Sequence, residues 1–152
     1  MAVYYSRPKL KSLSQGDRIS FVRQLRRISQ QELGEKIGMP QVHARTLVCR
    51  MEKHDRNVKP DRLEVISTVL NVNAAMLKRW DFEDPLDIFY QLLWVEELCP
   101  DFSFRHTIRV RPQNKTHEQL SNKYESWKEM RKKYRDMKIT YEEYWEWKLT
   151  KA

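Results

Sequence analysis

Histidines, cysteines and neighbouring carboxylates are the side chains that most often bind metals or catalyse reactions, and this chain does not group them for either purpose. No H-E-x-x-H pattern occurs, and the four histidines lack zinc-type spacing: His43, His54, His106 and His117. With only three glycines, the chain has no phosphate-binding loop and no dinucleotide-binding fingerprint. No Ser or Cys nucleophile has a partner base that the sequence can identify. We therefore expect no enzyme, no metal site and no cofactor.

Paired glutamates, two cysteines and an aromatic cluster have structural explanations. The pairs Glu96–Glu97 and Glu142–Glu143 are adjacent within expected helices, so we interpret their side chains as solvated surface on different helix faces. The two cysteines show no C-x-x-C spacing and are expected to be reduced packing residues. The aromatic cluster could stack on nucleobases, but the acidic residues around it favour a role in the core or in a protein contact. It comprises Tyr141, Tyr144, Trp145 and Trp147.

The most specific chemistry lies between positions 41 and 53. Glutamine bonds adenine in bidentate fashion, arginine bonds guanine in the same way, and aliphatic groups pack on the thymine methyl. Gln41, Arg45 and Val42 supply these three groups in the first turns of one expected helix, with His43 beside them. We therefore predict that these four residues contact base edges in a DNA major groove.

Two short helices joined by a tight turn position these side chains. Ser29 and Glu32 form an S-x-x-E capping box, which predicts a helix starting directly after the serine. Gly34 is small enough to let another helix approach closely, and Gly38 ends the helix in a left-handed conformation. Pro40 then suits the start of the next helix. A helix pair with a basic second member is typical of a helix-turn-helix.

At residues 28–39 the pattern I-S-Q-Q-E-L-G-E-K-I-G-M resembles the XRE-type, or lambda-repressor-like, helix-turn-helix regulators. The resemblance continues to about Leu77. It departs from the family at Pro40, where relatives carry Ser or Thr, and in a recognition segment about one helical turn longer than in the shortest members. That longer segment resembles regulators carried on mobile elements of Gram-positive bacteria. The resemblance implies a dimer that binds a double-stranded DNA operator.

Contacts to phosphates are expected around the recognition helix. Gln30 resembles the glutamine with which the family anchors a phosphate, and the basic residues after the reading positions are placed to position the protein rather than to specify sequence. The predicted phosphate contacts are Gln30, Arg50, Lys53, Arg56 and Lys59. Three arginines of the preceding helix lie off its apolar stripe and are expected to face phosphates or solvent: Arg23, Arg26 and Arg27.

The net charge of +8 is unevenly distributed. Residues 1–80 hold 16 Lys and Arg against 7 Asp and Glu, a net charge of +9, whereas residues 81–152 hold 13 against 14, a net charge of −1. A basic half joined to a neutral half indicates a polyanion-binding domain and a domain with another task. Hydrophobic residues make up 40% of the chain without an apolar run of membrane length or a signal-peptide core, so we expect a cytoplasmic protein.

These patterns predict a mainly α protein with three parts. Residues 1–15 form a basic arm or a locally packed terminus, residues 16–80 form a five-helix lambda-repressor-like domain, and residues 85–152 form a C-terminal α+β domain. Within the last part, residues 102–111 alternate apolar and polar side chains, which predicts one or two short strands that pair in a hairpin or with a second subunit. The helices expected beside them are 85–98, 116–137 and 140–149.

Two functions of different class fit this organisation. The first is sequence-specific DNA binding by a dimeric transcriptional regulator, a repressor of a phage or mobile element. The second is a protein-binding inhibitor, of the anti-defence or antitoxin type, whose C-terminal half binds another protein while the N-terminal half regulates its own operon. The neutral C-terminal half is a poor DNA-binding surface and a plausible partner surface, so the two functions can coexist.

Overall fold

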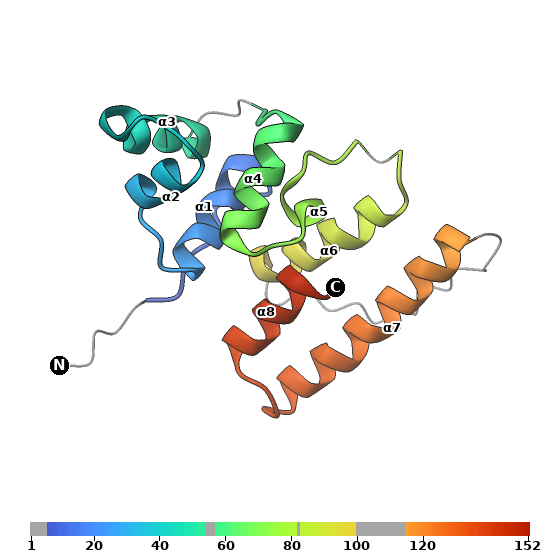
Figure 1. Ribbon diagram of the computed structural model, residues 1–152. Helices are drawn as coiled ribbons and strands as arrows, with labels where there is room; N and C mark the ends of the chain where they lie inside the picture. The colour runs from blue at the N-terminus through green and yellow to red at the C-terminus, as the bar shows by residue number, and fades with distance from the viewer. Residues whose placement is uncertain (1–5, 54–56, 82, 100–114) are drawn as a thin grey trace. The chain divides into compact units, whose positions relative to one another are not determined.

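The structure, a computed structural model, forms eight α-helices in the residues that it describes. Those residues are 6–53, 57–81, 83–99 and 115–152. The helices fall into two compact units, Met1–Arg79 and Trp80–Ala152 (Figure 1). The prediction of a mainly α fold is confirmed, and the described part of the chain holds no β-strand. The strand predicted at residues 102–111 lies outside the described residues.

The first unit contains five helices. Its second and third helices occupy the positions of the helix pair that the capping signals predict. In the capping box, Ser29 Oγ accepts the Glu32 N–H at 3.1 Å, and the Glu32 carboxylate accepts the Ser29 N–H at 2.7 Å. These two bonds satisfy N–H groups that a helix start leaves unpaired. The helices are α1 (Gln15–Leu25), α2 (Gln30–Lys36), α3 (Gln41–Lys53), α4 (Pro60–Leu70) and α5 (Ala74–Leu77).

Glycines set the close contacts of α3. A Cβ on Gly34 would lie 2.7 Å from the Cβ and the carbonyl oxygen of Ala44, so α2 approaches α3 at a distance that no other residue permits. A Cβ on Gly16 would lie 2.7 Å from the carbonyl oxygens of Met51 and Glu52, at the other end of α3. Gly38, with φ of 80°, ends α2 in the left-handed conformation that the sequence predicts.

A buried arginine ties α1 to the end of α5. Arg18 is 2% exposed, and its guanidinium donates to the backbone carbonyls of Leu13, Met76 and Lys78 at 3.0, 2.6 and 2.9 Å. Burial lowers the pKa of Arg18 to about 9, so the group stays protonated at neutral pH. Around it packs the apolar core of the unit, which includes Ile19, Phe21, Val22, Leu33, Val48, Ile66, Leu70 and Met76.

The described part of the N-terminal segment packs on the fold. Leu10 is 6% exposed, and the Ser12 hydroxyl donates to the Asp17 carboxylate at 2.6 Å. Ser14 caps α1 by accepting the Asp17 N–H at 3.2 Å, and α1 begins one residue earlier than predicted. Of the two alternatives for residues 1–15, local packing therefore describes residues 10–14.

The second unit contains α6 (Leu86–Leu98), α7 (Lys115–Arg135) and α8 (Tyr141–Thr150). Asp84 accepts the Leu86 N–H at 2.9 Å at the start of α6, and Thr140 with Glu143 forms a capping box at the start of α8. The helix expected at 116–137 is correct in kind but begins at Lys115 and ends at Arg135. No described helix has the length and apolar character needed to cross a membrane.

The interpretation of Glu96 and Glu97 as solvated surface is wrong. Glu96 accepts hydrogen bonds from Tyr144 Oη at 2.9 Å and from Lys148 Nζ at 2.7 Å, and Glu97 accepts from Trp145 Nε1 at 3.1 Å. Adjacent positions on a helix point in different directions, but aromatic residues of α7 and α8 surround this end of α6 on both sides. The expectation that the aromatic cluster lies in the core is confirmed for Tyr141, Tyr144 and Trp145, which are all buried.

Candidate nucleic-acid interface

The exposed face of α3 is polar and basic, and its side chains do not pack in the core. The helix turns three residues into the core, Ala44, Val48 and Glu52. Most of its remaining side chains are exposed, and even Val42 is 87% exposed. An aliphatic side chain so exposed in the first turn of a helix stabilises nothing in the fold. The exposed set comprises Gln41, Val42, His43, Arg45, Thr46, Arg50 and Lys53.

The structure thus brings together the four residues predicted to read base edges. Gln41, Val42 and His43 form the first turn of α3 and Arg45 lies in the next, and all four are exposed. Such a constellation can bond adenine and guanine edges and pack on a thymine methyl. Arg56, predicted to contact a phosphate, lies outside the described residues.

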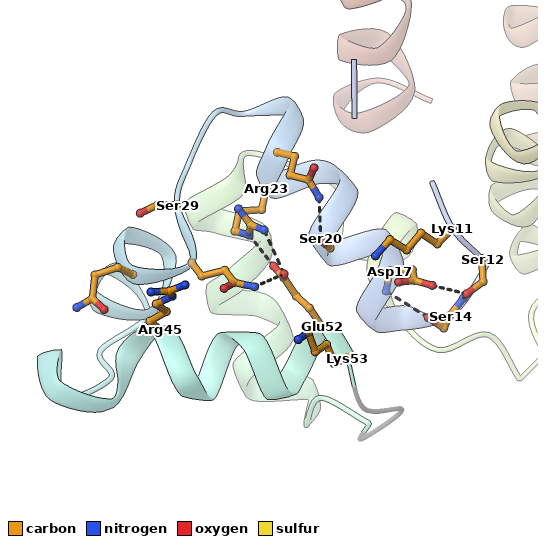
Figure 2. Close-up of a pocket in the computed structure, with 13 residues that line it drawn as sticks. Lys11, Ser12, Ser14, Asp17, Ser20, Arg23, Ser29, Arg45, Glu52 and Lys53 are labelled. Atoms are coloured by element: carbon orange, nitrogen blue, oxygen red, sulfur yellow. Dashed lines mark hydrogen bonds and ion pairs between the residues drawn. The ribbon is translucent and has the colours of Figure 1, made fainter. Parts of the chain in front are cut away.

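A polar groove of about 970 Å³ runs along one side of α3 (Figure 2). Hydroxyl and amide groups from α1 and the start of α2 line it together with cations, which is the donor chemistry that phosphate oxygens accept. Lys11, Arg45 and Lys53 line it and form no ion pair or hydrogen bond within the described residues. The uncharged hydrogen-bond donors that line this polar groove are Ser12, Ser14, Ser20, Gln24, Ser29, Gln30 and Gln31.

A charge-neutral network forms part of the polar groove. Arg23 bonds the Glu52 carboxylate twice, Nε to Oε1 at 2.6 Å and Nη2 to Oε2 at 3.1 Å (Figure 2). Gln30 Nε2 donates to the same Oε2 at 2.8 Å. Arg23 therefore neutralises the one carboxylate of α3, and the amide of Gln30 is held in place where it lines the groove. Arg23, expected to face phosphates or solvent, has a structural role instead, because its charge has a buried partner.

Arg26 is likewise structural. Its Nε donates to the Leu70 carbonyl and its Nη2 to the Asn71 carbonyl, both at 2.9 Å, so it ties α1 to the end of α4. Asn71 ends α4 in the left-handed conformation, with φ of 49°, where orphan carbonyls need donors. The expectation that Arg26 faces phosphates or solvent is therefore wrong.

A second, apolar-floored groove of about 350 Å³ lies on the other side of α3. Cations surround it: Arg50 of α3, Lys59 before α4 and Arg62 in its first turn are exposed and form no ion pair or hydrogen bond within the described residues. Its floor consists of Met39, Leu47, Met51 and Val58. The exposed face of α3 thus has a groove on each side that holds cations without an ion pair or hydrogen bond within the described residues.

Sequence reasoning missed Ser20, Gln24 and Arg62 as members of these grooves, and placed Lys11 only in the basic arm of residues 1–15. Arg62 carries a usable signal, because Pro60 marks a helix start and the third residue of that helix must lie near its N-terminal end. Lys11 does not, since only the packing of Leu10 brings its segment against the first unit. The described residues contain no group of three His, Cys, Asp or Glu side chains that could hold a metal ion.

Comparison with known proteins gave no matching family model, no matching curated protein and no matching solved structure.

Proposed function

We propose that this protein is a sequence-specific DNA-binding transcriptional regulator that acts as a dimeric repressor. One observation carries the proposal: the exposed reading face of α3, held rigidly by the Gly34–Ala44 contact and lying between two grooves that hold uncommitted cations. In this scheme α3 enters the major groove, where its first turns read bases, and the two grooves receive the flanking phosphates.

The electrostatics of the first unit support this scheme. Its Glu52 is neutralised by Arg23, and hydrogen bonds from the backbone and side chain of Ser29 lower the pKa of Glu32, which ties that carboxylate into the capping box. In the polar groove the cations without partners in the described residues, Lys11, Arg45 and Lys53, therefore outnumber the one carboxylate there that no cation neutralises, Asp17. Each phosphate neutralised by such a cation makes the affinity more dependent on salt, with a slope of about −0.9 per contact.

Dimerisation belongs to the proposal because helix-turn-helix proteins commonly bind two half-sites separated by one helical turn of DNA. In the second unit two separate apolar side chains are available for such a contact: Ile88 of α6 is 50% exposed and Met137, after α7, is 92% exposed. The same exposed apolar side chains favour the second candidate function, a C-terminal unit that binds another protein and inhibits it. Light scattering on the full chain, alone and with a partner recovered from cells, distinguishes self-association from a hetero-complex.

The decisive experiment selects duplexes from a randomised library with the full-length chain and then measures the affinity of the selected site over a salt series. The proposal requires an enriched motif and a log–log salt slope of several units. Lys36→Ala is the control for loss of one positive charge outside the grooves, because Lys36 lies on α2 and lines neither groove. Equal binding to all duplexes, or a slope near zero, would contradict the proposal.

A further inference from the structure

The first turn of α3 lacks the support that most helix starts have. The residue before it is Pro40, whose side chain offers no oxygen to cap an N–H group. Within the described residues the turn closes through the His43 N–H, which donates to the Pro40 carbonyl at 2.9 Å. The three residues that follow Pro40 are the reading candidates Gln41, Val42 and His43, all exposed, so their own side chains contribute no packing to the turn.

One side chain of α2 reaches across to this turn. Gln31 Nε2 donates to the backbone carbonyl of Gln41 at 2.9 Å and also to Glu35 Oε1 at 2.6 Å. An amide nitrogen carries two hydrogens, so both bonds form at once. The Glu35 carboxylate fixes the rotation of the Gln31 amide, which then presents its second N–H to the first residue of α3. The three residues form a chain of hydrogen bonds that joins α2 to the reading turn.

We propose that Gln31 is the positioning residue for base reading, because it holds the first turn of α3 in the register in which Gln41 and Val42 face base edges. The inference rests on the proposed function and deepens it. Gln41 and Glu35 use both hydrogens of the Gln31 amide nitrogen, so this nitrogen has none left to donate to a base. Gln30 is different, since its amide bonds Glu52 and not α3's first turn.

The test uses two substitutions of similar size in the full-length chain. Gln31→Met keeps the length of the side chain but removes the hydrogen-bond donor. Gln31→Glu keeps the shape but places a carboxylate, which only accepts, against the Gln41 carbonyl and the Glu35 carboxylate, so neither bond can form. At the base pairs that the first turn reads, the protein prefers one base over the other three. We expect Gln31→Met to lower this preference by about 2- to 10-fold, the range that one hydrogen bond supports, and Gln31→Glu to lower it further. The preference at the position read by Arg45 should remain.

The matched control is Gln24→Met. Gln24 lines the same polar groove, but its amide bonds Ser20 within α1 and does not touch α3. This control is expected to change the affinity for all duplexes alike and to leave the selected motif intact. If Gln31→Met did the same, Gln31 would be only another groove residue and the inference would be wrong.

Hydrogen exchange on the free protein separates failure of the inference from failure of the proposed function. Loss of the bond to Gln41 should increase exchange of the backbone N–H groups in the first two turns of α3 at least about twofold, with α1 and α4 unchanged. Faster exchange with an unaltered motif, or unaltered exchange, would each overturn the role of Gln31. A wild-type chain without any sequence preference would remove the proposed function and the inference with it, whatever the exchange result.

Discussion

Removal of the Glu96 carboxylate is expected to destabilise the second unit more than removal of its buried partner, Lys148. Lys148 is 2% exposed, its Nζ lies 2.7 Å from Glu96 Oε2, and it stacks over the rings of Tyr144 and Trp145 at 4.5 and 4.7 Å. Burial lowers the pKa of Lys148, while the Glu96 charge opposes that change. Glu96→Ala leaves an ammonium in the core without its carboxylate, which costs about 3–5 kcal/mol.

The opposite substitution leaves no isolated charge. In Lys148→Met, Glu96 keeps the Arg131 guanidinium, whose Nε lies 2.8 Å from Oε1, and the Tyr144 hydroxyl at 2.9 Å. Methionine fills nearly the same volume against the aromatic rings. We therefore expect a loss below about 1 kcal/mol, since replacing a buried charge by an apolar side chain is often close to neutral when the remaining partner stays paired. The double variant Glu96→Ala with Lys148→Met should recover most of the stability that Glu96→Ala loses.

Urea unfolding followed by tryptophan fluorescence measures this difference in the intact chain. All five tryptophans lie in residues 80–152, so the signal reports the second unit and is insensitive to the first. Free energies of unfolding from the three variants and the wild type give the coupling between the two sites. Equal losses in the two single variants, or a double variant no more stable than Glu96→Ala, would refute the account of Lys148 as a buried charge held by Glu96.

Three further outcomes follow from the two units. Arg45→Ala should cost about 1–3 kcal/mol on the selected site and relax one base pair, whereas Lys53→Ala should weaken all sequences alike and reduce the salt slope by about one unit, as library selection and a salt series would show. Gly34→Ala should destabilise the first unit by about 1–3 kcal/mol and weaken DNA binding, because the new Cβ meets Ala44 at 2.7 Å; thermal unfolding by circular dichroism checks the first effect. The charge of Lys148 and hydrogen bonds outweigh burial and lower the pKa of Glu96. The stability that the Glu96 carboxylate gives the second unit is therefore complete above pH 4.5 and is lost as the pH falls below that value. Glu96→Gln should remove this part of the acid dependence of unfolding detected by tryptophan fluorescence.

Local signals predicted the helix-turn-helix well, because its geometry depends on single residues. The capping box of Ser29 and Glu32 determines where α2 begins, and Gly38 determines where it ends. Gly34 announced a close helix contact, although only the structure shows that the contact is with Ala44. The exposed positions of α3 followed from the scarcity of apolar residues in that segment. These features need no knowledge of distant parts of the chain.

The second unit was harder to predict because the contacts of Glu96 join residues 31 to 52 positions apart. Glu96 takes its partners from α7 and α8, at Trp127, Arg131, Tyr144 and Lys148. Nothing in the local pattern of α6 distinguishes a glutamate that faces solvent from one that faces this cluster. A lysine at the fourth position after Tyr144 would ordinarily be assigned to a solvated face, and burial is the rarer outcome for lysine.

The charge of the first unit is a second property that the sequence alone describes incompletely, and this property matters for the proposed function. Composition counts all cations equally, but the structure separates them by whether a partner already holds them. Arg18 and Arg26 bond backbone carbonyls and Arg23 bonds Glu52, so their donors are directed at the fold itself. Arg45 and Lys53 lie on the exposed face of α3 without such partners in the described residues, and therefore add to the field that an approaching polyanion meets. Each cation of either group raises the net charge by one, so the net charge overstates the number of phosphates that this unit could neutralise. A measured salt slope should follow the smaller set of uncommitted cations.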